Sequence, residues 1–224
     1  YLALGDGLLK KDLSVSRVKS TLNKLIASQK GLSDRAYLLL KWNQPILRPA
    51  LLSDNSGWKT YPFYLKAVKT ADELKWQIGF STYYSSTCPC SSALARQLIQ
   101  DEFKNQFGAK KLNLEEIINW LGENQVAAPH SQRSRADVKL TFNGGAESVE
   151  FIKYIDAIEQ ALRTPVQTAV KRVDEQEFAR LNGENLMFVE DALRRMKDAL
   201  SDFNELKNFS IKAQHFESLH DHNA

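Results

Sequence analysis

Residues 74–90 read LKWQIGFSTYYSSTCPC, and this stretch decides the fold. The part from Leu74 to Tyr84 is rich in aromatic and apolar residues, which predicts a strand that ends near Cys88. Cys88 and Cys90 are the only cysteines of the chain and lie one proline apart. A disulfide between them would close a strained ring, so a metal ligand, a reactive thiol or both remain. Two buried, small apolar side chains are the alternative.

The composition describes a globular protein of one large domain or two small ones. The chain has 224 residues, of which 43% are hydrophobic and 25% are charged. The net charge of +3 is too small to indicate nucleic-acid binding. No apolar run approaches the roughly 20 residues of a membrane helix. Two cysteines in so long a chain favour a reducing compartment, so we expect the cytoplasm. We also expect residues to be missing at both ends.

The sequence before residue 74 predicts one helix and two strands. Residues 14–29 place apolar side chains on one helical face after a serine that can cap the helix. Residues 37–42 and 59–68 are rich in apolar and aromatic residues, which is typical of strands. Pro45 and Pro49 predict a break between these two strands.

The sequence after Cys90 predicts four helices and two strands. We expect helices over 91–107, 113–121, 148–171 and 185–203, and strands over 135–142 and 208–219. Asn113 can cap the second of these helices. The run Asn143-Gly144-Gly145 should end the first strand, and Pro165 should kink or split the long helix.

His130 is the candidate ligand nearest to the next strand. It lies in the run Pro129-His130-Ser131-Gln132-Arg133-Ser134. Imidazole is the commonest metal ligand, and the polar side chains that follow suit a phosphate or a carboxylate. A solvated loop is an equally good interpretation of this run. The three other histidines, His215, His220 and His222, lie near the C-terminus.

Three further charged runs have a functional and a simpler interpretation. Residues 171–175 offer carboxylates to a metal and two bases to an anion, or they form an ordinary charged helix end. Glu190 could accept two hydrogen bonds from a guanidine-like edge, or it could serve only the helix dipole. Glu217 and His220 are plausible proton-transfer partners or frayed tail residues. Three positions apart, they need a bend to face one site, because strand side chains alternate.

Five motifs in order resemble type IB GTP cyclohydrolases. The motifs are Ser86-Thr87-Cys88-Pro89-Cys90-Ser91, His130 to Ser134, Lys171 to Glu175, Phe188 to Asp191 and Phe216 to His222. Each motif alone is weak, but together they cover roughly residues 74–222. The resemblance implies a metal-dependent enzyme that converts GTP and water to 7,8-dihydroneopterin triphosphate and formate. It also implies a homotetramer with active sites at subunit interfaces.

The resemblance also implies a role for individual residues. The implied ligands for a divalent metal (zinc, manganese or iron) are Cys88, His130 and Glu175. The implied catalytic groups are Cys90, Glu217 and His220. The implied guanine anchor is Glu190. Charge alone adds three candidates for the triphosphate, namely Arg133, Lys171 and Arg172.

The implied fold is α+β, with tandem tunnelling-fold modules that form an antiparallel sheet with helices packed on one face. The expected modules are residues 1–70, shortened at its start, and residues 71–224. The helical insert 91–121 separates Cys88 from His130 and departs from the family pattern. A tunnelling-fold nitrile reductase, another purine- or pterin-binding enzyme and a non-enzymatic metal-binding scaffold are the alternatives.

Overall fold

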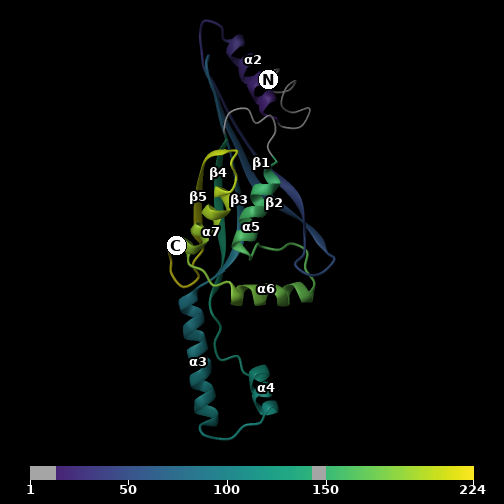
Figure 1. Ribbon diagram of the computed structural model, residues 1–224, viewed down its shortest axis with the longest axis vertical. Helices are drawn as coiled ribbons and strands as arrows, with labels where there is room; N and C mark the ends of the chain where they lie inside the picture. The colour runs from purple at the N-terminus through teal and green to yellow at the C-terminus, as the bar shows by residue number, and fades with distance from the viewer. Residues whose placement is uncertain (1–13, 143–149) are drawn as a thin grey trace.

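The computed structural model describes residues 14–142 and 150–224, and its centre is one antiparallel sheet (Figure 1). The strands pair in chain order, β1-β2-β3-β4-β5. Their bounds are β1 Ala36–Pro49, β2 Ser56–Lys69, β3 Leu74–Thr87, β4 Ser131–Phe142 and β5 Leu206–His215. The predicted α+β class and antiparallel sheet are therefore confirmed.

The described residues also form six helices. They are α2 Val15–Ser28, α3 Pro89–Phe107, α4 Leu114–Glu123, α5 Phe151–Leu162, α6 Arg172–Glu184 and α7 Val189–Ser201. Helix α5 packs against α7 and β3, and α7 packs against β5. Helix α2 lies against β1 and β2, while α3 and α4 extend beyond the end of the sheet (Figure 1). None of the described helices combines the length and apolar character that a membrane span requires.

One hydrophobic core joins the sheet to α2, α5 and α7. Helix α5 buries Ile155, Ile158 and Leu162, and α7 buries Met196 and Leu200, all with no exposed surface. These positions recur every three or four residues, so each helix turns one apolar stripe to the strands. Each such side chain contributes about 1.5–3 kcal/mol when it is fully buried. The core therefore fixes β3 and β4, which carry the candidate site.

The predicted break is wrong at Pro45, because β1 continues through this residue, whereas the strand does end at Pro49. Pro45 lies opposite Thr60 and Pro49 opposite Ser56. Among the described strands β1 pairs only with β2 and so forms an edge of the sheet. A proline is tolerated on an edge strand, because its missing N–H need not serve a second neighbour. The first strand is thus longer than residues 37–42.

The predicted helix 148–171 is too long in the structure. Helix α5 ends at Leu162, where Arg163 adopts a left-handed conformation with φ 66°. The next residues pair with β3, since Ser85 N donates to Thr164 O (2.8 Å) and Val166 N to Tyr83 O (3.0 Å). Residues 171–175 therefore begin helix α6 rather than end a helix. The start of the predicted helix, the Asn143-Gly144-Gly145 turn and residues 1–13 lie outside the described residues.

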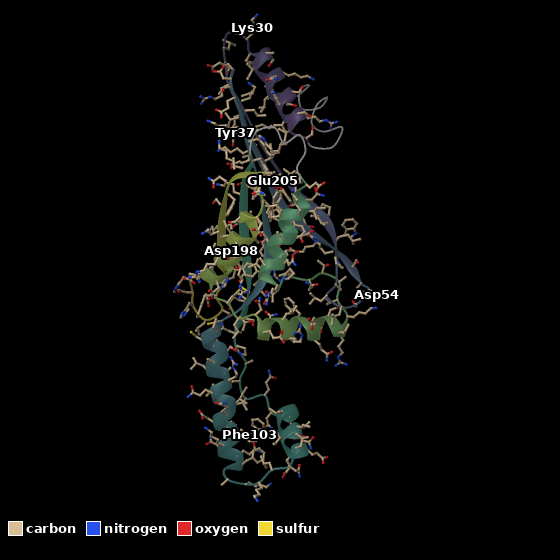
Figure 2. The ribbon with its side chains drawn as sticks, in the orientation of Figure 1. Lys30, Tyr37, Asp54, Phe103, Asp198 and Glu205 are labelled. Atoms are coloured by element: carbon tan, nitrogen blue, oxygen red, sulfur yellow. The ribbon has the colours of Figure 1, made fainter. Side chains whose placement is uncertain are left out.

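Helices α3 and α4 form a hairpin that connects β3 to β4. Asn113 caps α4 as predicted, because its side chain accepts from Glu116 N and the Glu116 carboxylate accepts from Asn113 N, both at 2.9 Å. The Phe103 ring lies 4.9 Å from both the Phe107 and the Trp120 ring. Figure 2 shows Phe103 within this hairpin and away from the sheet. The hairpin thus has an aromatic core of its own.

Candidate active site

The β3–β4 ladder brings Cys88 and His130 together. Thr87, the last residue of β3, lies opposite Ser131, the first residue of β4, and their hydroxyl groups are 2.6 Å apart. Next to this pair, Cys88 follows β3 and His130 precedes β4, and Cys88 N donates to His130 O at 3.4 Å. The whole α3–α4 hairpin therefore leaves and re-enters the sheet at one point, and the predicted thiol and imidazole flank that point.

The two cysteines differ in environment because a helix begins between them. Cys88 is the N-cap of α3, and Pro89 lies in the first turn. Proline is tolerated there, because the first-turn N–H groups have no hydrogen-bond partner inside the helix. Cys88 is half-buried, whereas Cys90 is exposed in the first turn. Helical geometry, not strand alternation, therefore separates the two thiols. Ser91 adds a contact that the sequence did not reveal, because its Oγ accepts from His130 N at 3.0 Å.

A pocket of about 470 Å³ opens beside this junction. It unites five of the ten predicted site residues, namely Cys88, Cys90, His130, Glu217 and His220. Thiol, imidazole and carboxylate groups on one pocket can bind a metal ion and transfer protons. No other described pocket gathers these three kinds of group.

The same pocket also has apolar lining residues, several of which come from helix α3. Leu94, Ala95 and Leu98 of α3 line it, together with Phe188 before α7 and Leu219 after β5. A lining of apolar residues with a few polar groups is typical of a small-molecule site. The hairpin is thus part of the pocket and not only a connection between strands.

Glu217 and His220 reach the pocket because the chain bends after β5. The strand ends at His215 and not at the predicted residue 219. Phe216 N then donates to Arg133 O at 3.1 Å, and Glu217 N donates to the Asn223 side chain at 3.2 Å. The expected bend is present and turns both side chains to the pocket.

Gln132 connects His130 to Glu217. The His130 Nδ1 atom lies 3.1 Å from Gln132 Oε1, and Gln132 Nε2 donates to Glu217 Oε1 at 3.2 Å. Gln132 itself is buried on β4. Two pocket residues that lie far apart in the sequence are therefore held by one side chain.

Glu190 lies near the pocket, at the first turn of α7. Its neighbour Phe188 lines the pocket, and Met187 N donates to Thr87 O at 3.2 Å. His215 is buried, and its Nε2 atom lies 3.1 Å from the Tyr84 hydroxyl. Burial lowers the pKa of His215, while the negative charges of Glu217 and Glu190 act in the opposite direction. The structure thus places Glu190 within electrostatic reach of the same region.

The predicted ligand Glu175 lies in a second pocket of about 450 Å³, together with Arg133. Ser131 and Gln132 also line this second pocket, whereas the preceding residue, His130, lines the first. Lys171 and Arg172 are exposed at the start of α6, and Lys171 Nζ pairs with Asp54 at 2.5 Å. These basic side chains do not line the first pocket.

Asp174 has a structural role, unlike its neighbour Glu175. It is fully buried, and its carboxylate accepts from Leu52 N, Ser53 N, Ser53 Oγ and Lys171 N at 2.6–2.9 Å. These hydrogen bonds hold the pKa of Asp174 well below its usual range. Asp174 therefore fixes the β1–β2 turn to α6, and Glu175 is the carboxylate that remains open to a ligand.

The donor chemistry of the first pocket fits a divalent metal only in part. Thiolate and imidazole are ligands that zinc and related metals prefer, and Cys88 and His130 supply both. Within the described ranges, however, no group of three His, Cys, Asp or Glu side chains is arranged to hold a metal. Cys88 and His130 thus supply suitable ligand types in one pocket, while Glu175 lines the second pocket.

Known proteins show extensive similarity to this chain. The sequence profile of the family described as "Type I GTP cyclohydrolase folE2" matches residues 4–224. GTP cyclohydrolase FolE2 of Pseudoalteromonas translucida (strain TAC 125) is 44% identical over 226 residues, which cover 100% of this chain and 74% of the relative. GTP cyclohydrolase FolE2 of Pseudomonas putida (strain GB-1) is 43% identical and is covered to 75%.

A solved structure shows a weaker likeness. Uricase from Arthrobacter globiformis has a TM-score of 0.48 and 8% sequence identity, over 96% of this chain and 61% of the uricase. That likeness is too low to bear on function. The profile match and the identity over the full chain decide the family: this chain belongs to the type I GTP cyclohydrolase folE2 family.

Proposed function

We propose that this chain is a metal-dependent GTP cyclohydrolase of the type IB, tunnelling-fold group. It converts GTP and water to 7,8-dihydroneopterin triphosphate and formate, an early reaction of folate and pterin synthesis. Family membership over the whole chain supports the activity. The single observation that carries the assignment of the site is the pocket in which Cys88, Cys90, His130, Glu217 and His220 meet.

Cys88 and His130 are the proposed core of the metal site, for zinc, manganese or iron. The first is half-buried at the N-cap of α3, and the second has Nδ1 engaged with Gln132, so that Nε2 is available as a ligand. Glu175 is the proposed third ligand, and the metal content of a Glu175→Gln variant tests it. The chemistry that a divalent metal supplies at such a site is the activation of water near neutral pH.

Cys90, Glu217 and His220 are the proposed proton-transfer groups. Hydrolysis at C8 of guanine needs one group that accepts a proton from the attacking water. It also needs a group that protonates the departing ring nitrogen. A thiol, a carboxylate and an imidazole in one pocket offer both functions. Leu94 and Leu98 add apolar surface to the same pocket.

Glu190 is the proposed guanine anchor. A carboxylate can accept two parallel hydrogen bonds from N1 and N2 of guanine, and adenine lacks this pair of donors. Arg133, Lys171 and Arg172 are the proposed triphosphate contacts. Arg133 lines the second pocket, whereas Lys171 would have to exchange Asp54 for the phosphate.

We propose further that residues 1–70 and 71–224 form two tandem modules, and that the protein is a homotetramer with active sites at the interfaces. The unbroken order β1 to β5 is compatible with two modules that share one sheet. A second subunit could also supply a carboxylate to the incomplete ligand set. Light scattering of the purified protein tests the assembly, and a monomer that turns over GTP would exclude interface active sites.

The two cysteines provide the sharpest test of the function. Cys88→Ala should lose both bound metal and turnover, whereas Cys90→Ala should keep the metal and lose turnover. Elemental analysis measures the metal, and pterin fluorescence with formate release measures turnover, with and without a chelator. Each variant is the control of the other, because each removes one thiol and the two positions lie only two residues apart. If Cys90→Ala turns over GTP at the parental rate, Cys90 has no catalytic role and contributes only to packing. Oxidation of a nicotinamide cofactor without formate release would instead favour a nitrile reductase.

A further inference from the structure

The Gln132 side chain contacts two site residues and lies outside the first pocket. Its Oε1 atom meets His130 Nδ1 at 3.1 Å, and its Nε2 atom meets Glu217 Oε1 at 3.2 Å. We refer to these three residues as the Gln132 bridge. The strands β4 and β5 are neighbours in the sheet. The bridge links His130, directly before β4, to Glu217, the second residue after β5.

The carboxylate of Glu217 determines the orientation of the Gln132 amide. An ionised carboxylate only accepts hydrogen bonds, so the NH₂ group of Gln132 must face Glu217. The amide oxygen then faces His130, and an amide oxygen also only accepts. His130 must therefore carry its proton on Nδ1. This tautomer leaves the lone pair of Nε2 unprotonated.

The backbone around Gln132 is rigid enough to hold this arrangement. Gln132 is only 8% exposed and pairs with Ser86 of β3. Two residues on, the Ser134 hydroxyl lies 2.7 Å from the Ser86 hydroxyl, and both side chains are fully buried. A buried amide between two fixed strands loses little further entropy when it holds its partners.

We propose that Gln132 is a positioning residue of the active site. It selects the Nδ1–H tautomer of His130, so that Nε2 is free to bind a metal, and with its other end it orients Glu217. This inference rests on the proposed metal-binding role of His130. Partners behind metal-bound histidines contribute about 10–100-fold to metal affinity. A glutamine here adds a second function, because one amide can serve an imidazole and a carboxylate at once.

Two substitutions separate the two ends of the bridge. Gln132→Leu removes both contacts, whereas Gln132→Glu keeps an acceptor for His130 and removes the donor to Glu217. Gln106→Leu is the matched control, because Gln106 accepts from Trp120 Nε1 at 2.5 Å inside the helical hairpin and does not line the pocket. Long-range ¹H–¹⁵N spectra of the metal-free protein report the tautomer of His130, with His130→Ala as the assignment reference. Zinc titration reports the metal affinity.

Metal-free wild type should show the Nδ1–H tautomer of His130. Gln132→Leu should lose this signature and bind zinc about 10–100-fold more weakly, while Gln106→Leu should match wild type. Gln132→Glu should keep the tautomer and bind zinc more tightly than Gln132→Leu. It should also release formate with a lower kcat and an unchanged KM for GTP. A wild-type protein with the proton on Nε2, or equal zinc affinity in Gln132→Leu, overturns the proposal.

The tautomer and the zinc affinity do not depend on GTP, so this proposal and the proposed function can fail separately. A chain that shows both expected effects but does not turn over GTP would retain the bridge and lose the proposed function. If Gln132→Leu does not fold, wild type and Gln132→Glu still decide. An Nε2–H tautomer in either of them contradicts the bridge.

Discussion

Removal of the Glu159 carboxylate should destabilise the fold. Its Oε1 atom accepts from Lys59 Nζ at 2.8 Å, Tyr61 Oη at 2.9 Å and Thr82 Oγ1 at 2.6 Å. The side chains of Lys59 and Glu159 are only 9% and 12% exposed. Removal of one partner of a buried ion pair costs about 3–5 kcal/mol, because the other charge remains buried.

Glu159→Gln should lie near the lower end of this range. The amide oxygen of the variant can still accept from Tyr61 and Thr82, so the loss is mainly that of the charge opposite Lys59. We therefore expect a loss of about 3 kcal/mol in the free energy of unfolding. For a chain of this length, that loss corresponds to roughly 6–12 °C in Tm.

Asp156→Asn is the matched control on the same helix. Asp156 pairs with Arg48 at 2.5 Å but is 52% exposed, so its substitution should cost at most about 1 kcal/mol. Urea unfolding followed by tryptophan fluorescence, at a fixed protein concentration, measures both variants. If the two variants lose equal stability, the assignment of a buried ion pair to Lys59 and Glu159 is refuted.

Three further predictions follow from the carboxylates and the buried histidine. Asp174→Asn should lower Tm at pH 7, and the gap to wild type should narrow as the pH falls below about 4. A carboxyl group whose pKa is lowered in the folded state stabilises fully above its unfolded pKa of about 3.9, and progressively less as the pH falls toward its folded pKa. Asp54→Asn should not change Tm, and a gap that does not narrow below about pH 4 would contradict this prediction. Glu190→Ala should weaken GTP binding by about 2–5 kcal/mol in calorimetry, and unchanged affinity would move the anchor elsewhere. Burial lowers the pKa of His215, so protonation favours the unfolded state and wild type should lose stability as the pH falls below about 6.5. His215→Gln should show a flatter pH dependence of Tm. Equal pH profiles of the two proteins would show that His215 does not cause the loss.

Local sequence signals predicted most of the strands and helices. The Asn113 cap and the strand that ends before Cys88 could be read from residue types alone, because both depend on nearby atoms. Helix α6 was missed because its sequence is mostly polar, so it shows little apolar periodicity. Pro45 was misread because its effect depends on whether the strand lies at an edge, which is a property of the whole sheet.

The site was predictable where strand pairing determines it. A strand before Cys88 and a strand after His130 suffice to bring these two residues together if the strands pair. The position of Glu175 depends on where α6 lies, and no local pattern shows that. The contact between Tyr84 and His215 depends on the register of three strands, so it could not be inferred from spacing either.

The junction at Thr87 and Ser131 has a consequence for how this enzyme can vary. Because the α3–α4 hairpin leaves and returns through adjacent, paired strands, its length is not coupled to the distance between Cys88 and His130. Insertions and deletions beyond the first turns of α3 can accumulate without a change in the relative position of Cys88 and His130. Those first turns, however, carry Leu94 and Leu98 into the pocket wall. The hairpin can therefore be remodelled at its tip independently of the chemistry, whereas changes near its base alter the shape presented to the substrate.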